Sequence, residues 1–422
     1  MDEQPNLETQ INPEPSQSGQ QQQLARYRRV VAILLVAGVA FVGGYGLGHK
    51  GVSAEGGKVE ISKGSQPNVA DYNLLWQVLD QLNAKYVDRG NLDQKKLLYG
   101  AANGLLQATG DPYTVFFDPE QTKEFQEEMS GSFEGIGAEM GLQDGQIIII
   151  APLEDTPASK AGIRAGDAVL KINGESTMGL SVDQAVNKIR GPANTEVTLT
   201  ILHKSDKQPV DIKITRSKIE IKSVKLETKE ANGKKIAVIH LSRFGDDTDG
   251  LFAHAVDVIL AGNYQGIVLD LRSNPGGYLQ TAVNLASNWV DSGQVVVKAV
   301  DSEKHTDASN AQGLSRLKGY KTVILVDNGS ASASEILAGA LQDYGLATLV
   351  GEKTFGKGSV QDLIPLADYQ STVKITVAKW YTPKDRGIDK NGLEPDIKVE
   401  RTSQDIEANR DPQMDKALEL FK

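Results

Sequence analysis

Residues 329–337 read Gly-Ser-Ala-Ser-Ala-Ser-Glu-Ile-Leu, and Lys357 follows a short distance later between two glycines. Between the two segments, residues 335–343 have the apolar spacing of a helix, and residues 347–350 are typical of a short buried strand. The glycines beside Lys357 predict a turn. This part of the chain is therefore expected to follow one order of elements: a serine segment, a helix, a strand and a lysine turn.

This order combines two residue types that can carry nucleophilic chemistry without histidine. A serine hydroxyl is a weak nucleophile until a base takes its proton, and lysine can be that base when burial lowers its pKa. Ser332 lies at the predicted helix N-terminus, where unpaired N–H groups favour developing negative charge. A purely structural alternative is that Ser330, Ser332 and Ser334 cap the helix, with Glu335 completing its first turn.

A second glycine element lies upstream. Residues 266–272 form an apolar strand with a charged end and run into Ser-Asn-Pro-Gly-Gly at 273–277. Consecutive glycines let backbone amides approach a ligand closely. We expect the N–H of Gly276 or Gly277, with that of Ala333, to form an oxyanion hole, a term worth roughly 3 kcal/mol per donor. Taken alone, this segment indicates only a turn.

Together these segments resemble the carboxy-terminal processing peptidases, also called tail-specific peptidases. The resemblance rests on Leu-Asp-Leu-Arg-Ser-Asn-Pro-Gly-Gly at 269–277, the serine segment at 329–337, and Gly-Glu-Lys-Thr-Phe-Gly-Lys-Gly-Ser-Val-Gln at 351–361. It extends from about residue 71 to residue 397 and includes Gly-Asp-Pro-Tyr-Thr at 110–114, Trp-Tyr-Thr-Pro at 380–383 and Gly-Leu-Glu-Pro-Asp at 392–396.

The resemblance implies a serine peptidase that works with a lysine base and needs no cofactor. Ser332 would be the nucleophile, Lys357 the general base and Gln361 the residue that orients the lysine. The core would be an α/β fold around a mostly parallel sheet. The chain departs from the family at 384–386, where Lys-Asp-Arg precede Gly387 instead of one small residue. That departure leaves the conformation of this surface loop open.

Residues 133–218 look like the PDZ domain found within this family. Such a module receives an extended peptide as an added strand and holds its terminal carboxylate on backbone N–H groups. The resemblance assigns the carboxylate loop to Gly135, Ile136, Gly137 and Ala138. Arg190, at the end of the predicted helix 182–189, resembles a family arginine that couples peptide binding to catalysis. It is equally well explained as a solvated charge at a helix end.

Other kinds of site fit the sequence poorly. Gly351 and Gly356-Lys357 meet most of a phosphate-loop pattern, but Gly358 replaces the magnesium-binding hydroxyl and strands are predicted at 359–379. The five histidines form no paired motif; His240 and His254 are interpreted as packing or surface residues. The chain has no cysteine, which excludes a zinc-thiolate site, and we expect no metal.

The N-terminal region predicts a membrane anchor. Residues 30–48 are 19 residues without a charge, long enough to cross a hydrocarbon core of roughly 30 Å. Arg26, Arg28 and Arg29 precede this segment, so the positive-inside rule keeps the N-terminus in the cytoplasm and places the catalytic body outside the cell membrane. The alternative is a cleaved signal, with Val-Ser-Ala at 52–54 as the cleavage site.

The predicted fold class is α/β and β, with a single N-terminal transmembrane helix ahead of a PDZ domain and an α/β peptidase core. The predicted parts are a disordered cytoplasmic tail (1–29), the transmembrane helix (30–48), a linker (49–70), a helical N-terminal region (71–132), the PDZ domain (133–218), the serine peptidase core (219–405) and a C-terminal helix (406–422). Within the helical region, residues 72–106 have amphipathic spacing, and in the family such helices serve assembly, so a homo-oligomer is expected.

The sequence therefore predicts a membrane-anchored serine endopeptidase that cleaves extracytoplasmic proteins near their free C-termini. The net charge of −10 argues against a nucleic-acid-binding face, so no nucleic-acid partner is expected. A second hypothesis, from another class, is a PDZ scaffold without enzymatic activity that captures protein C-termini outside the membrane.

Overall fold

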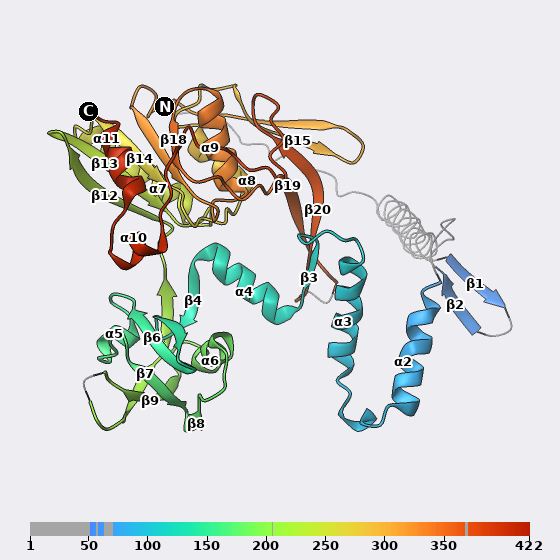
Figure 1. Cartoon of the computed structure of the whole chain (residues 1–422). Helices are drawn as coiled ribbons and strands as arrows, with labels where there is room; N and C mark the ends of the chain where they lie inside the picture. The colour runs from blue at the N-terminus through green and yellow to red at the C-terminus, as the bar shows by residue number, and fades with distance from the viewer. Residues whose placement is uncertain (1–50, 56–57, 63–70, 205, 368–369) are drawn as a thin grey trace, which may run out of the picture. The chain divides into compact units, whose positions relative to one another are not determined.

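The computed structural model describes residues 51–55, 58–62, 71–204, 206–367 and 370–422 (Figure 1). The chain forms two units, 1–93 and 94–422. The predicted tail and transmembrane helix, residues 1–48, lie outside the described residues. Among the residues that the structure describes, no helix has both the length and the apolar character needed to cross a membrane.

The described part of the first unit contains a short hairpin and a helix. Its elements are β1 (Gly51–Glu55), β2 (Lys58–Ser62), α2 (Asn73–Lys85) and the 3₁₀ turn η1 (Arg89–Asn91). We predicted a linker over 49–70, whereas β1 and β2 pair as antiparallel strands. The alternating sequence Lys-Val-Glu-Ile-Ser of β2 accounts for the difference, because period-two spacing favours a strand.

The helix α2 has no buried residue. Large apolar side chains on it are exposed, among them Leu74, Leu75 and Trp76. The expected assembly through this region stays a prediction. The amphipathic spacing at 72–106 corresponds to two helices: α2 ends at Lys85, and α3 (Gln94–Gln107) begins in the second unit.

The second unit opens with helices on either side of a short strand. α3 is followed by β3 (Val115–Phe117) and α4 (Pro119–Ser130). Asp118 accepts a hydrogen bond from the Gln121 N–H at the start of α4, and Gly131, with φ of 65°, ends the helix. The predicted helical region 71–132 thus also contains a strand, and β3 pairs with a strand of the peptidase core.

A curved antiparallel sheet with two helices forms the PDZ module (Figure 1). Its strand order is β10-β9-β7-β6-β5, with β8 paired to β7. The elements are β5 (Ala138–Gln143), β6 (Gln146–Pro152), α5 (Pro157–Lys160), β7 (Ala168–Ile172), β8 (Glu175–Ser176), α6 (Val182–Ile189), β9 (Glu196–Leu202) and β10 (Val210–Thr215). Alternate residues of β9, namely Val197, Leu199 and Ile201, are fully buried, as expected for a sheet with one covered face. Strand β5 lies at the edge of this sheet.

Two strands flank the module in the chain and pair with each other. β4 (Ser132–Gly135) and β11 (Ser217–Glu220) are antiparallel, with Gly135 opposite Ser217. This pairing brings the two ends of the segment 133–218 together, as expected for a module inserted into the chain.

The peptidase core is built on a six-stranded sheet in the order β12-β13-β14-β17-β18-β21. Its strands are β12 (Val224–Ala231), β13 (Lys234–Leu241), β14 (Gly266–Asp270), β17 (Thr322–Val326), β18 (Thr348–Gly351) and β21 (Ile397–Lys398). All neighbours from β13 onward are parallel, and only β12 is antiparallel. Every residue of β14 and β17 is buried, because helices cover both faces.

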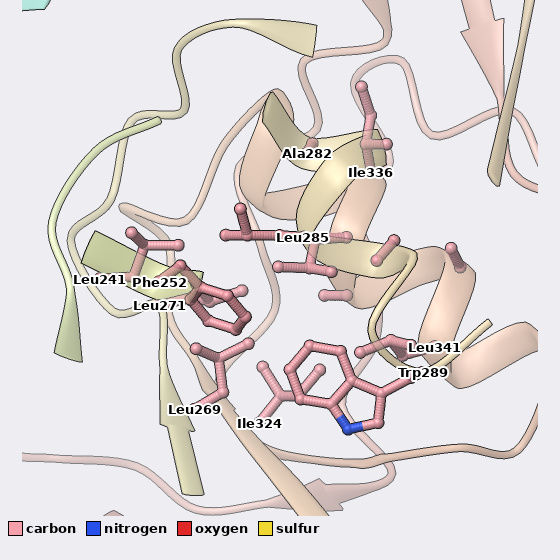
Figure 2. Packing of buried hydrophobic residues seen from close by; sticks show 14 of the residues in the cluster. Leu241, Phe252, Leu269, Leu271, Ala282, Leu285, Trp289, Ile324, Ile336 and Leu341 are labelled. Atoms are coloured by element: carbon pink, nitrogen blue, oxygen red, sulfur yellow. The ribbon is translucent and has the colours of Figure 1, made fainter. Parts of the chain in front are cut away.

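One face of this sheet packs against α7 (Thr248–Ala261), α8 (Leu279–Ala286) and α9 (Ala333–Asp343). Figure 2 shows Phe252, Leu285 and Leu341 from these helices gathered over Leu269 and Ile324 of the sheet. The other face is covered by α11 (Pro412–Glu419). We predicted one C-terminal helix over 406–422. Instead, α10 (Ser403–Glu407) ends and Pro412 begins α11, since proline is favoured in the first turn of a helix.

A second antiparallel sheet has the order β16-β15-β20-β19, with β3 paired to β20. Its strands from the core are β15 (Val295–Asp301), β16 (Thr306–Asn310), β19 (Ser359–Pro365) and β20 (Thr372–Tyr381). The β19–β20 hairpin follows the lysine turn directly. It therefore carries Gln361 to the same region as Lys357.

Candidate active site

Ser332 immediately precedes α9 and has an unusual backbone conformation. Its φ is 53° and its ψ is −115°, a region that residues with a side chain rarely adopt. Such backbone strain clusters at functional sites, where surrounding structure holds it in place. The serine stands at a sharp bend between the sheet and the helix, with its side chain at the helix N-terminus.

The three serines of this segment differ in what their hydroxyls do. The Ser330 hydroxyl donates to the Leu271 carbonyl at 2.8 Å, and the Ser334 hydroxyl donates to the Asn274 carbonyl at 3.0 Å; both side chains are fully buried. Among the described residues, no group accepts a hydrogen bond from the Ser332 hydroxyl, which belongs to a capping box with Glu335 and lines a cavity of about 380 Å³. The capping interpretation therefore fits Ser332, the N-cap of α9, whereas Ser330 and Ser334 bond to carbonyls outside the helix.

Lys357 lines the same cavity from the turn after β18. Gly356 has a φ of 90°, and a Cβ there would lie 2.7 Å from the Gly392 nitrogen, so this position needs glycine. The Lys357 Nζ lies 5.1 Å from the centre of the Tyr113 ring. Burial lowers the pKa of Lys357, and the charge of Lys374 lowers it further, while Asp111 and Glu335 act in the opposite direction. A lysine with a lowered pKa can act as a base.

The predicted dyad and its predicted orienting residue share the cavity without touching. Ser332, Lys357 and Gln361 all line it. Among the described residues, however, neither the Ser332 hydroxyl nor Gln361 hydrogen bonds to the Lys357 Nζ. The Gln361 Nε2 donates instead to the Ser359 and Thr376 hydroxyls, at 2.8 and 3.2 Å. In this structure the Lys357 Nζ lies over the Tyr113 ring.

The glycine pair lies directly against the serine. A Cβ on Gly276 would be 2.8 Å from the Ser332 Cβ and 3.0 Å from the Ala333 nitrogen. The structure distinguishes the two glycine N–H groups predicted as oxyanion donors. The Gly276 N–H already donates to the Asn274 side chain at 2.9 Å. Within the described part of the chain, the N–H groups of Gly277 and Ala333 have no acceptor, which makes them the pair available to an oxyanion.

The predicted carboxylate loop joins β4 to β5. The carbonyl of Ile136 accepts from the Ala158 N–H, and that of Gly137 accepts from the Leu153 N–H. The Thr156 hydroxyl also donates to the Gly137 carbonyl, at 2.9 Å. Gly135, Ile136 and Gly137 are buried, and Ala138 begins the edge strand β5. An unpaired edge strand beside a helix is the arrangement that strand addition requires.

Comparisons with known proteins show which protein family the chain resembles. The sequence model of peptidase family S41 matches residues 235–399, and that of the PDZ domain matches residues 148–202. The carboxy-terminal processing protease CtpB of Bacillus subtilis is 38% identical over 76% of this chain and 66% of its own length. A CtpA-like serine protease of Staphylococcus aureus is 40% identical over 81% of this chain and 67% of its own length.

The chain belongs to peptidase family S41. It falls among the carboxy-terminal processing proteases, which are serine-type peptidases, and it spans about two thirds of the length of these relatives. A solved structure from Bacteroides fragilis assigned to the S41 proteases superposes with a TM-score of 0.56 at 16% identity, covering 84% of this chain and 98% of that one. At that identity the likeness shows the fold alone.

The S41 core contains a buried carboxylate that the sequence analysis treated only as a helix cap. Glu335 is fully buried. Its carboxylate accepts from the N–H groups of Ser332, Gly356 and Lys357, at 2.9, 2.8 and 3.0 Å. The Thr354 hydroxyl donates to it as well, at 2.5 Å. Glu335 thus links the backbone of the serine segment directly to the backbone of the lysine turn.

The sequence carried a weak signal for this role. A glutamate three residues after a serine is a common capping pair, and nothing in the spacing shows that its carboxylate reaches a turn beyond the next strand. Burial raises the pKa of Glu335, and its hydrogen bonds to the Thr354 hydroxyl and the three N–H groups oppose that rise.

Arg190 directly follows α6 and contacts the helix that leads to the PDZ module. Its guanidinium lies 3.2 Å from the Glu127 carboxylate of α4 and 5.1 Å from the centre of the Phe133 ring. Both side chains are partly shielded from solvent, with 38% of Arg190 and 18% of Glu127 exposed. The arginine therefore connects α6 to α4 rather than pointing freely into solvent.

The loop that departs from the family pattern is anchored by its own charges. The Arg386 guanidinium lies 2.6 Å from the buried Asp343 carboxylate, and the Lys384 N–H donates to the same carboxylate at 2.8 Å. Asp343 ends α9, so the loop is fixed to the far end of the helix that Ser332 begins. Its conformation is thereby tied to the core.

Among the described residues, no histidine lines this cavity. His240 forms ion pairs with Asp270 and Glu227, at 3.3 and 3.5 Å, and hydrogen bonding to Asp270 raises the pKa of His240. The interpretation as a packing or surface residue thus overlooked a charged cluster. Within the ranges that the structure describes, no group of three or more His, Cys, Asp or Glu side chains is placed to hold a metal ion.

Proposed function

We propose that the chain is a membrane-anchored endopeptidase that cleaves proteins near their C-termini through a Ser332/Lys357 dyad. One observation carries the proposal: of three neighbouring serines, only Ser332 has a hydroxyl that donates to no carbonyl, and it shares a cavity with a lysine whose pKa is lowered. A nucleophile and a base with these properties suit acyl transfer.

The reaction would proceed in two acyl-transfer steps. Lys357, in its neutral form, takes the Ser332 proton while the serine oxygen attacks the scissile carbonyl. The resulting oxyanion accepts hydrogen bonds from the N–H groups of Gly277 and Ala333. Lys357 then returns the proton to the leaving amine, which frees the C-terminal fragment. Water, activated by the same lysine, hydrolyses the acyl-enzyme and restores Ser332.

Among the described residues no hydrogen bond joins Ser332 to the Lys357 Nζ, which favours a second candidate, a PDZ scaffold without catalysis. A serine-directed phosphonate separates the two functions. The enzyme is expected to be labelled at Ser332 and to lose labelling in Ser332→Ala, whereas a scaffold would stay unlabelled. Hydrolysis of casein that stops on labelling would link the modified serine to turnover.

Residues 30–48 are proposed to anchor the enzyme with its catalytic body outside the cell, supported by their uncharged length and the arginines before them. Protease added to intact protoplasts is expected to remove the region beyond residue 51 and to leave the tail before Arg29 protected. A soluble form that begins at Glu55 would show instead that the segment is a cleaved signal.

The PDZ module is proposed to select substrates by their terminal carboxylate. A charge-assisted hydrogen bond is roughly twice as strong as a neutral one. Substrates with a free, apolar C-terminal residue are therefore expected to be cleaved about tenfold faster than the same chains amidated, a difference of about 1.4 kcal/mol. Equal rates of cleavage of free and amidated substrates would show that the PDZ module does not select substrates by their terminal carboxylate.

Arg190 tests whether peptide binding reaches the catalytic cavity. If its contact with Glu127 reports occupancy, Arg190→Ala shrinks the difference between free and amidated substrates. Lys188→Ala is the matched control, because Lys188 lies on the same helix and pairs with the exposed Glu175 instead. If the difference in cleavage rate between free and amidated substrates is unchanged in Arg190→Ala, the arginine is only a charge at a helix end.

A further inference from the structure

A second lysine lines the catalytic cavity. Lys374 lies on β20, opposite Leu363 of β19 and Val115 of β3. It lines the cavity that also contains Ser332 and Lys357. Within the described residues, no carboxylate lies within ion-pair distance of its Nζ. A cation without a paired carboxylate beside a base is unusual, since buried charges are normally paired.

Two aromatic rings hold this lysine. Its Nζ lies 5.1 Å from the centre of the Phe117 ring and 5.7 Å from that of the Phe125 ring. The two rings are themselves stacked, with centroids 5.5 Å apart. Aromatic faces attract a cation without neutralising it. The two rings therefore offset part of the cost of burying this charge, without a carboxylate that would neutralise it.

We propose that Lys374 is a positioning residue of the reaction, whose positive charge keeps the amine of Lys357 unprotonated and able to accept the Ser332 proton. This inference rests on the proposed dyad. Lys374 touches neither substrate nor the serine in this role; it acts through Lys357. A like charge nearby disfavours the protonated form of a lysine, in the same direction as burial.

The electrostatic surroundings of the two lysines agree with this role. Burial lowers the pKa of Lys357 most, and Lys374 is the next cause, against the opposing charges of Asp111 and Glu335. Burial also lowers the pKa of Lys374, which Glu128 partly offsets. The remaining groups that face these lysines or line the cavity are Tyr113, with Asp389 near it, Tyr278 and Arg243.

The test is the pH dependence of kcat/KM in the full chain. The native enzyme gains activity as Lys357 loses its proton. In Lys374→Met the loss of the positive charge favours the protonated form of Lys357. The acidic limb of the plot of kcat/KM against pH therefore moves to higher pH. On that limb kcat/KM falls roughly threefold to tenfold, and it approaches the native value at high pH. Lys374→Arg, which keeps the charge, holds the limb at or below the native pH.

Lys416→Met is the matched control. Lys416 lies on α11, which covers the other face of the core sheet, and pairs with Glu419, so its loss leaves the acidic limb in place. The rate of phosphonate labelling of Ser332 against pH gives the same readout without turnover. It also serves for Lys374→Gln if the methionine variant does not fold.

The outcomes distinguish a failure of the role proposed for Lys374 from a failure of the Ser332/Lys357 dyad. A Lys374→Met profile that superimposes on the native one, while Ser332→Ala stays inert, overturns the role of Lys374 and leaves the dyad standing. A limb that moves equally in Lys374→Arg and Lys374→Met also overturns it, because charge would not matter. Continued labelling or turnover in Ser332→Ala would overturn the dyad itself.

Discussion

Lys357→Arg is expected to be as inactive as Ser332→Ala, each losing about 10⁴-fold or more of kcat. The base must be neutral to take the serine proton, and a guanidinium stays protonated at any pH that the protein survives. Burial lowers the pKa of the lysine amine, but the same environment cannot neutralise arginine. Casein turnover by the purified variants, with the chelator EDTA present and absent, measures the effect.

A neighbouring lysine provides the control for this substitution. Lys353 lies in the same segment, is half exposed and pairs with Glu394 at 3.2 Å, so Lys353→Arg should turn over at the native rate. Thermal unfolding of all variants should be alike. Near-native turnover in Lys357→Arg would contradict the assignment of Lys357 as the base. Loss of activity of the native enzyme with EDTA would indicate a metal.

Glu335→Ala is expected to show the second largest effect, on stability as well as on turnover. The substitution leaves four donors of a buried site without their acceptor: the N–H groups of Ser332, Gly356 and Lys357 and the Thr354 hydroxyl. Each buried donor left unsatisfied costs about 1–3 kcal/mol, so the free energy of unfolding should fall by about 4 kcal/mol or more. Urea denaturation measures this loss.

The same carboxylate should matter for catalysis in molecules that remain folded. It is the shared anchor of the serine segment and the lysine turn, and a misplacement of about 1 Å between reacting groups can lower the rate about 100-fold. Glu335→Gln keeps the shape and one acceptor oxygen, so it should be more stable than Glu335→Ala while kcat still falls. The exposed Glu400 provides the control, and equal stability of Glu335→Ala and Glu400→Ala would contradict the role of Glu335.

Local patterns in the sequence predicted most of the elements around the site. The helix predicted at 335–343 is α9, and the strand at 266–272 is β14, because their apolar spacing is set by neighbours in the chain. The order of serine, helix, strand and lysine turn was likewise readable. Family membership followed from the same segments, since they carry the motifs.

Predictions that depended on isolated stretches were less accurate. The linker expected at 49–70 contains the hairpin β1–β2, and the helix expected at 406–422 is divided before Pro412. Composition decided the prediction of the linker, whereas strand pairing and proline geometry decided the structure of the two segments.

The sequence by itself determined which residue types stand beside the predicted helix, and only the tertiary structure decided what each one does. Three serines are equivalent in the pattern, but contacts with the loop after β14 engage Ser330 and Ser334 and leave Ser332 toward the cavity. Gly276 and Gly277 are equally suited to an oxyanion, until the Asn274 side chain takes the N–H of one.

Glu335 and Lys374 show most clearly which roles cannot be predicted from the sequence. A capping glutamate and a lysine in a strand are ordinary in sequence, because nothing local records what lies across the fold. Packing brings the lysine turn back onto the first turn of α9, and it brings β3 and α4 against β20, which places Phe117 and Phe125 around Lys374. Burial and charge at the site arise from these long-range contacts, so the pKa values that make Lys357 a base are properties of the folded chain alone.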